Sequence, residues 1–238
     1  MENVDWSFLV TQEDTKTKGY TLEPSDERFA KSGVTIATGF DIGQHNEYEL
    51  DKLFGEGSKV YNLFLPYVGL KGAAAEAKLK EKPLDLGKIN ASYIDERVKS
   101  YKYNQLAESW NKANTEIPFS DLPKHYATVL MSVAYQYGPT RLSEKTEKFW
   151  GHATSGNWLS VEAELRDFKD PFPERRVREA DYLAKGNEAY FKDYPHLDPR
   201  PKPRPVMQEA DVTPPTPKPY TQDILRFSIP AFQKKEAM

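Results

Sequence analysis

Lys31–Asn46 reads KSGVTIATGFDIGQHN, and this stretch combines a strand pattern with polar groups suited to chemistry. From Val34 to Ile42, bulky apolar residues alternate with small or polar ones, and this period of two predicts a half-buried strand. One face of the strand would be apolar. The other would carry a hydroxyl at Thr35 and a carboxylate at Asp41, with small residues between them.

The spacing of these two groups decides whether they can act together. In a regular strand Thr35 and Asp41 lie on the same face about 20 Å apart, too far to act on one atom. A bend or bulge at Gly39 would bring them together. A flat floor between a hydroxyl and a carboxylate suits a sugar ring. An ordinary edge strand with a polar face explains the same pattern equally well.

The bulk properties narrow the class of protein. The 238 residues can form one substantial core, or one domain with an appendage. A charged fraction of 29% and a mean hydropathy of −0.74 indicate a soluble protein. The net charge of −3, with no cluster of basic residues, argues against a nucleic-acid partner.

Several kinds of site and segment are not expected. The chain has no cysteine, which excludes disulfides, thiol catalysis and cysteine metal sites. Its four histidines lack ligand spacing, so we expect no metal and no cofactor. No apolar run approaches the roughly 20 residues that cross a bilayer. The opening MENVDWSFLV lacks the basic segment of a secretory signal, so we expect other machinery to deliver the protein from the cytoplasm.

Residues 4–14 are predicted to form a short amphipathic helix. Trp6, Leu9, Val10 and Glu13 follow the i, i+3, i+4, i+7 spacing and share one face. Glu13 would then be a partly buried carboxylate at the end of an apolar stripe. Burial raises the pKa of a carboxyl, which suits a general acid. A solvated helix end is the simpler alternative.

The remaining pattern is a small sheet followed by many helices. The strands are expected at 18–22 and 31–42. Helices are expected after Asn46, which forms a capping box with Glu49, after Ser58, at 73–80, from Ser92 with Asp95 as an acidic capping box, at 123–137, 142–155 and 157–168, and at 173–185 with a stop at Gly186. About nine helices with one sheet predict an α+β fold with segregated elements.

The composition predicts three regions. Residues 1–194 would form the folded domain. Prolines recur every few residues through 195–219, which predicts an extended linker. Residues 220–238 contain the apolar ILRFSIPAF, a peptide that would dock on the domain or bind a partner.

Four motifs, in order along the chain, resemble the phage-type lysozymes, and most closely the branch of the pesticin C-terminal domain. FLVTQED is similar to the helix with the catalytic glutamate, and GVTIATGFDIGQ to the TIGxG strand in its pesticin-like form. VLMSVAYQYG is similar to the buried helix, and PERRVREADYLAKG to the RR-x-x-E helix. The resemblance implies a lysozyme-like fold with a small antiparallel sheet and a mainly helical part.

The resemblance also implies roles for particular residues. Glu13 matches the general acid, Thr35 the threonine near the attacking water, and Asp41 the second carboxylate. Arg175 matches an arginine that pairs with the catalytic glutamate in T-even phage lysozyme. Gln136 matches an amide that lines the cleft, although it could simply end the core helix.

Two departures from the family pattern matter. Some phage enzymes hold their aspartate in the loop before the threonine, where this chain offers Asp26, so Asp26 is a rival for the second carboxylate. The family usually has a histidine after the TIGxG strand, and Phe40 stands at that position here, so the ion pair that the histidine makes elsewhere is lost.

Other polar and aromatic residues have plainer interpretations. Arg176 and Arg178 are expected to be surface charges, and Glu179 to make a helical pair with Arg175 or Arg176. The aromatic residues of the helical part are expected to pack in the core or at its rim; they are Tyr135, Tyr137, Trp150 and Trp158.

The implied activity is hydrolysis of the β-1,4 bond between N-acetylmuramic acid and N-acetylglucosamine in peptidoglycan, with inversion and without a cofactor. The protein would act in the periplasm or at the cell wall as an antibacterial toxin, an injected effector or an endolysin. It could have an immunity protein or a delivery component as a partner. A lytic transglycosylase and a non-catalytic module that binds cell wall or a secretion partner are the alternatives.

Overall fold

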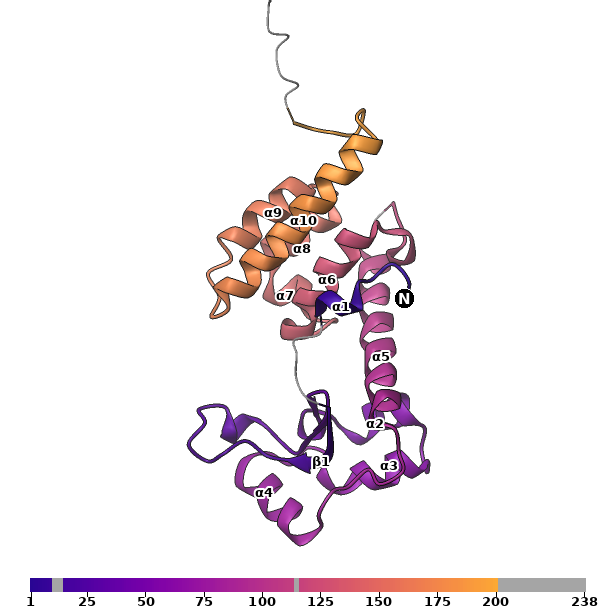
Figure 1. The fold of residues 1–238 in the computed structure, drawn as a ribbon, viewed down its shortest axis with the longest axis vertical. Coiled ribbons are helices and arrows are strands. Elements are labelled where there is room, and N and C mark those ends of the chain that lie inside the picture. Colours follow the sequence, from indigo (N-terminus) through magenta and orange to yellow (C-terminus); the bar gives the residue numbers. More distant parts are fainter. Residues whose placement is uncertain (10–14, 114–115, 201–238) are drawn as a thin grey trace, which may run out of the picture. The chain divides into compact units, whose positions relative to one another are not determined.

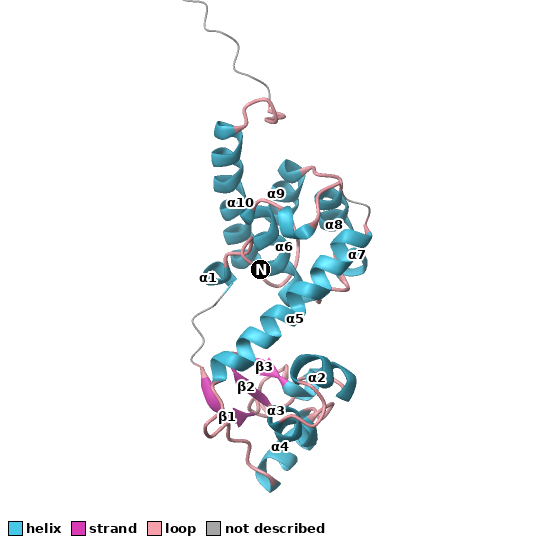
Figure 2. Cartoon of the chain, turned by 90° about the vertical axis from the view of Figure 1, so that its right-hand side faces the viewer, coloured by secondary structure: helices cyan, strands magenta, loops and turns pink. Residues whose placement is uncertain are grey.

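A computed structural model describes residues 1–9, 15–113 and 116–200 of the chain. In these ranges most of the structure is helical, with a three-stranded antiparallel sheet of order β1-β2-β3 (Figures 1 and 2). The arrangement confirms the predicted lysozyme-like α+β fold.

The elements have the following bounds. The strands are β1 (Lys16–Tyr20), β2 (Thr35–Ala37) and β3 (Phe40–Asp41). The α-helices are α1 (Trp6–Leu9), α2 (Glu47–Phe54), α3 (Lys59–Phe64), α4 (Gly72–Glu81), α5 (Ala91–Lys112), α6 (Lys124–Tyr137), α7 (Leu142–Lys145), α8 (Glu147–Thr154), α9 (Trp158–Arg166) and α10 (Pro173–Asp193). Short 3-10 helices are η1 (Phe29–Lys31), η2 (Ile42–Gln44), η3 (Leu65–Tyr67) and η4 (Phe119–Asp121).

The single strand expected at 31–42 is instead a tight hairpin. Ala37 and Gly39 have φ values of 54° and 84°, in the left-handed region, so the chain reverses between β2 and β3. The sequence left open whether the strand is regular or bends at Gly39, and the structure shows a bend sharp enough to divide it into two strands. Glycine permits this conformation freely, whereas Ala37 adopts it at some cost in strain.

The helix starts show where capping signals are reliable. Asn46 and Glu49 form the predicted capping box of α2, and the hydroxyl of Ser58 accepts from Tyr61 N at the start of α3. The start expected at Ser92 is wrong. The side chain of Asn90 accepts from Ser92 N, so α5 begins at Ala91. Asn is as good a cap as Ser, and the carboxylate of Asp95 is engaged elsewhere.

Helix α10 does not stop at Gly186 as predicted but continues to Asp193. This glycine serves close packing. A Cβ built on Gly186 would lie 2.2 Å from Cγ of His125 on α6, so only glycine lets the two helices approach this closely. The predicted helix at 142–155 is also interrupted, forming α7 and α8.

The buried apolar residues form two clusters, and α5 contributes to both. The first cluster packs α6 against α5 and the helices that follow, with Leu106 and Trp110 supplied by α5. The second packs the sheet against α2 and α3, with Ile94 supplied by α5. The 22-residue helix α5 therefore carries side chains from one core to the other.

Residues Met1–Asp198 form one compact unit. Of the predicted proline-rich linker 195–219, only the residues up to Arg200 are described, and the predicted peptide 220–238 lies outside the described residues. None of the described helices has the length and apolar character needed to span a membrane.

Candidate functional site

The hairpin brings together two of the predicted site residues. Thr35 of β2 and Asp41 of β3 are direct partners across the antiparallel pair. Residues opposed in this way have Cα atoms about 4.5–5.5 Å apart, in place of the roughly 20 Å of a regular strand. Thr35 is buried and Asp41 is partly exposed, so of the two groups the carboxylate is the more accessible to solvent.

The carboxylate of Asp41 is held by four hydrogen-bond donors. Its Oδ1 accepts from the backbone N–H groups of Gly33 and Gly43, both at 3.0 Å. Its Oδ2 accepts from Ser32 Oγ at 3.0 Å and from Gln44 Nε2 at 3.1 Å. A carboxylate offers about four acceptor positions, so each is occupied. A water molecule can reach this carboxylate by replacing one of these donors.

Two glycines make this arrangement possible. A Cβ on Gly33 would lie 2.6 Å from Cα of Gly43, and one on Gly43 would lie 2.2 Å from the carbonyl oxygen of Leu70. Side chains at either position would push the two backbones apart. Gly33 and Gly43 are therefore required for both N–H groups to reach Asp41.

Gln44 is the exposed member of the four donors, and its amide is itself held. Its Nε2 also donates to Lys31 O, and its Oε1 accepts from Lys71 Nζ at 3.1 Å. The chain of contacts from Lys71 through Gln44 to Asp41 fixes which way the amide points.

The turn between β2 and β3 is anchored to α5. Asp95 accepts from Thr38 N at 3.2 Å and from Thr38 Oγ1 at 2.8 Å. Thr15 Oγ1 lies 3.4 Å from Thr38 Oγ1, which places the first residue after the segment 10–14 against the same turn. This role differs from the helix cap that the sequence pattern predicts for Asp95, because it depends on a contact 57 residues away in the chain.

Glu13, the predicted general acid, lies outside the described residues. The resemblance implies that Arg175 pairs with this glutamate, and that pairing stays a prediction. Among the described residues Arg175 donates to Glu179 Oε1 at 3.1 Å and to the carbonyl oxygen of Ser132 at 3.0 Å. Arg175 is thus fixed between α6 and α10, with part of its side chain exposed.

The expectation that Arg176 is a surface charge is wrong. Its side chain is 2% exposed and pairs with Asp170 at 3.0 Å and with Glu179. Glu179 is fully buried and also accepts from Ser132 Oγ, so the predicted helical pairing of Glu179 is confirmed with both arginines. Burial raises the pKa of Glu179, and the neighbouring guanidinium groups of Arg176 and Arg175 oppose that change, so the alternating charges let Arg176 and Glu179 be buried together.

The last two predicted supporting residues lie in different surroundings. Gln136 is half-buried near the end of α6, and its Oε1 has no hydrogen-bond partner among the described residues. Asp26 makes a two-point ion pair with Arg28, with Nη2 at 2.7 Å from Oδ2. Hydrogen bonds from Arg28 lower the pKa of Asp26 to about 2.

A group of titratable residues lies beside the hairpin. The ring of His45 stacks on Phe40, with centroids 4.8 Å apart, and burial is the main cause that lowers the pKa of His45. Glu49 and Asp41 oppose this change in the pKa of His45, whereas the ammonium of Lys102 adds to it. Lys102 of α5 and Asp41 of β3 are therefore both within electrostatic reach of one imidazole.

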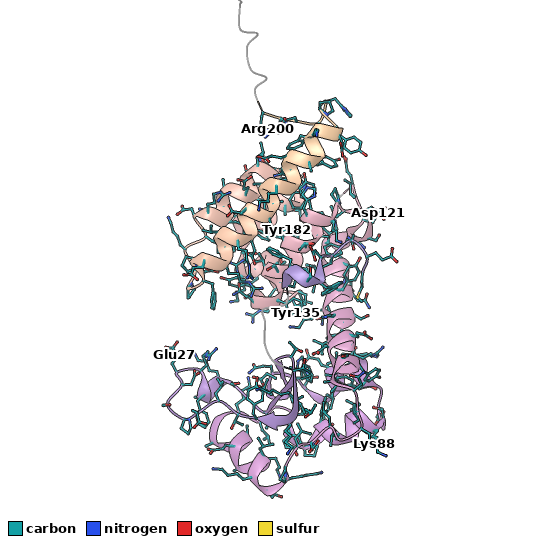
Figure 3. The ribbon with its side chains drawn as sticks, in the orientation of Figure 1. Glu27, Lys88, Asp121, Tyr135, Tyr182 and Arg200 are labelled. Atoms are coloured by element: carbon teal, nitrogen blue, oxygen red, sulfur yellow. The ribbon has the colours of Figure 1, made fainter. Side chains whose placement is uncertain are left out.

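The aromatic residues of the helical part mainly pack, as predicted. Trp158 stacks on Tyr126 with centroids 3.8 Å apart, and Trp150 is 9% exposed. Tyr137 donates to Asp170 Oδ2 at 2.9 Å and so joins the buried ionic network. Tyr135 is half-buried near the C-terminal end of α6 (Figure 3).

Two pockets lie away from these residues. One of about 290 Å³ lies among α7, α8 and α9, and one of about 390 Å³ lies beside Trp150. Neither is lined by a predicted site residue. Among residues 1–9, 15–113 and 116–200, no group of His, Asp and Glu side chains could hold a metal ion.

Comparison with known proteins identifies the family. The family model described as Pesticin, "Bacterial toxin homologue of phage lysozyme, C-term", matches residues 3–159. A comparison with curated proteins gave no match. Membership of a lysozyme-homologous family implies a glycoside hydrolase whose substrate is peptidoglycan. With its α+β fold and its paired Thr35 and Asp41, the chain belongs to the pesticin family of bacterial toxin domains homologous to phage lysozyme.

Proposed function

We propose that the protein is a muramidase that hydrolyses the β-1,4 bond between N-acetylmuramic acid and N-acetylglucosamine in peptidoglycan. Membership of the pesticin family supports hydrolase chemistry. At the level of residues, the pairing of Thr35 with Asp41 carries the proposal. Inverting hydrolysis needs a carboxylate base on the side of the sugar that water attacks, and Thr35 lies beside Asp41 where its hydroxyl would orient that water.

In this mechanism Glu13 donates a proton to the leaving oxygen, and Asp41 accepts a proton from water oriented by Thr35. The exposed amide of Gln44 is the donor that this water replaces at Asp41. Inversion requires the two carboxyls to stand about 6.5–9.5 Å apart, leaving room for water. Asp26 is the alternative second carboxylate, and Arg175 and Gln136 are supporting residues.

Membership of a family of bacterial toxin domains supports an antibacterial role. A bacterial toxin domain that cuts peptidoglycan would kill or lyse competing cells, as a bacteriocin, an injected effector or an endolysin. We propose that it is made in the cytoplasm and acts in the periplasm or at the cell wall after delivery by other machinery. A producing cell would then need an immunity protein.

Digestion of purified sacculi, followed by mass spectrometry of the products, tests the activity. New reducing N-acetylmuramic acid ends are expected. Anhydro-muramyl ends would identify a lytic transglycosylase, and binding without any new ends would identify a non-catalytic wall-binding module. NMR of the first anomer released distinguishes inversion from retention.

The residue assignment needs a separate test. Glu13→Gln is expected to abolish turnover while the far-UV circular dichroism and melting temperature stay close to those of the wild type. Lysis by this variant at the wild-type rate would refute the role of Glu13. Asp26→Asn serves as the comparison variant, since a large loss there would move the second carboxylate from Asp41 to Asp26.

A further inference from the structure

Among residues 1–9, 15–113 and 116–200, two half-buried lysines on one face of α5 have no carboxylate partner. Lys99 and Lys102 are both partly buried. Neither ammonium makes an ion pair with any carboxylate in the part of the chain that the structure describes. Some other lysines of the helical elements do make such pairs, among them Lys78 and Lys80 of α4. Lys112, on the same helix, lies 2.5 Å from Glu108.

Each of the two ammonium groups is held over an aromatic ring. Lys102 Nζ lies 4.3 Å from the ring centroid of Tyr135, and Lys99 Nζ lies 5.8 Å from that of Trp6. Both are within the roughly 6 Å of a cation–π contact. Such contacts hold a cation in place without neutralising it, so the charge stays available to an anion.

The position of these lysines relates them to the candidate site. Asp95, Lys99 and Lys102 follow each other at i, i+4 and i+7, so they share one face of α5. Asp95 is already occupied by the β2–β3 turn through Thr38. The same face therefore fixes the hairpin at one end and presents, beyond it, two cations that no carboxylate of the described residues neutralises.

Electrostatics supports the same placement. Lys102 and Asp41 both act on the pKa of His45, so the cation lies near the hairpin. Burial lowers the pKa of Lys102 to about 8, which leaves it largely charged at pH 7. A charge kept in a half-buried position without a counter-ion is costly, and an incoming anion would relieve that cost.

We propose that Lys99 and Lys102 form a binding site for carboxylate groups of the substrate, namely those of the peptide stems of peptidoglycan. This inference rests on the proposed function. Residues three apart on a helix, such as Lys99 and Lys102, have Cβ atoms about 5–6 Å apart. Charge-assisted hydrogen bonds from the two ammonium groups would therefore hold one or two neighbouring carboxylates. The site would thereby favour glycan strands that carry peptides over bare polysaccharide.

The test compares three soluble substrates at low and at high salt. They are stem-bearing glycan fragments, the same fragments stripped by an amidase so that only the lactyl carboxylate remains, and uncharged chitin oligomers. Lys102→Met and Lys99→Met are each expected to raise KM on stem-bearing fragments about tenfold with kcat little changed. Lys102→Arg should retain most of the binding. Lys112→Met is the matched control and should leave KM unaltered.

Several outcomes would overturn the inference. An equal KM for Lys102→Met and Lys112→Met on stem-bearing fragments would do so. If Lys102→Met raised KM on chitin oligomers as much as on stem-bearing fragments, the inference would also fail, because that result would indicate a structural defect. An equal effect on stripped and stem-bearing fragments would assign the site to the lactyl carboxylate and refute the peptide stem.

Co-sedimentation with sacculi separates this inference from the proposed function. If the wild type cleaves nothing, the proposed function fails. A loss of sacculus binding in Lys99→Met and Lys102→Met, but not in Lys112→Met, would still support the lysine site, and equal binding by all of them would refute it.

Discussion

Replacing Lys102 by methionine should make the folded protein more stable. In the folded state burial lowers the pKa of this lysine from 10.5 to about 8. One pKa unit corresponds to 1.36 kcal/mol, so charged Lys102 destabilises the fold by at most about 3 kcal/mol at pH 7. Partial exposure screens the charge, and we expect a gain of about 1–3 kcal/mol for Lys102→Met.

The other consequences of this substitution nearly cancel. Methionine keeps the apolar stem of lysine, and its sulfur contact with Tyr135 is worth about 0.3–1.5 kcal/mol. The lost cation–π contact is worth about 0.5–2 kcal/mol. Desolvation therefore decides the sign. For a chain of this size, 1 kcal/mol moves the melting temperature by about 2–4 °C, so a gain of about 1–3 kcal/mol should raise it by roughly 2–12 °C.

The effect should depend on pH in a defined direction. Between about pH 8 and 10.5 the unfolded chain binds the proton of Lys102 and the folded chain does not, so wild-type stability gains with rising pH. The advantage of Lys102→Met should be complete below about pH 8 and should vanish near pH 10.5. Melting curves of both proteins across this range measure the difference. A lower melting temperature for Lys102→Met, or a difference independent of pH, would refute the reasoning.

Three further outcomes concern the rest of the fold. Glu179→Leu should destabilise the protein by about 3–5 kcal/mol in urea unfolding, because it leaves the buried Arg176 without its main counter-charge; a loss under 1 kcal/mol would contradict this. Gly186→Ala should lower the free energy of unfolding by about 1–3 kcal/mol through its clash with His125, although alanine favours a helix by about 1 kcal/mol. A more stable variant would show that the clash relaxes. NMR titration should give Asp26 a pKa of about 2, so its stabilising contribution is complete above about pH 3.8 and is lost as pH falls from there to about 2. Arg28→Ala should return this pKa towards 3.8.

Local patterns in the sequence predicted much of the fold. The capping box at Asn46 and the bend at Gly39 follow from the chemistry of a few adjacent residues. The capping box is confirmed, and of the two alternatives for the strand the structure shows the bend. The motif order predicted the family. These signals are reliable because caps and tight turns are decided by neighbouring atoms.

Predictions that depend on contacts distant in sequence were less reliable. Glycine ends many helices, but in this protein the close approach of His125 decides the role of Gly186. Arginine is usually a surface residue, and the burial of Arg176 is possible because Asp170 and Glu179 pair with it. Helical periodicity cannot reveal such partners.

The candidate site was predicted in part. The pairing of Thr35 with Asp41 depended on one bend, which the structure shows, while Glu13 stays a prediction. The contact of Asp95 with the turn and the position of Lys102 had no sequence signal, since each is an ordinary charged residue in a long helix. Their roles come from what α5 is packed against.

The crowded surroundings of Asp41 complicate the most common experiment on a suspected catalytic acid. Asparagine has the same shape, but its NH2 group would face Gln44 Nε2 or a backbone N–H, donor against donor. Turning Gln44 around to accept would in turn set its NH2 against Lys71. An inactive Asp41→Asn protein would thus be ambiguous between lost chemistry and a misassembled loop, and only a measured structure or melting profile of that variant would tell them apart.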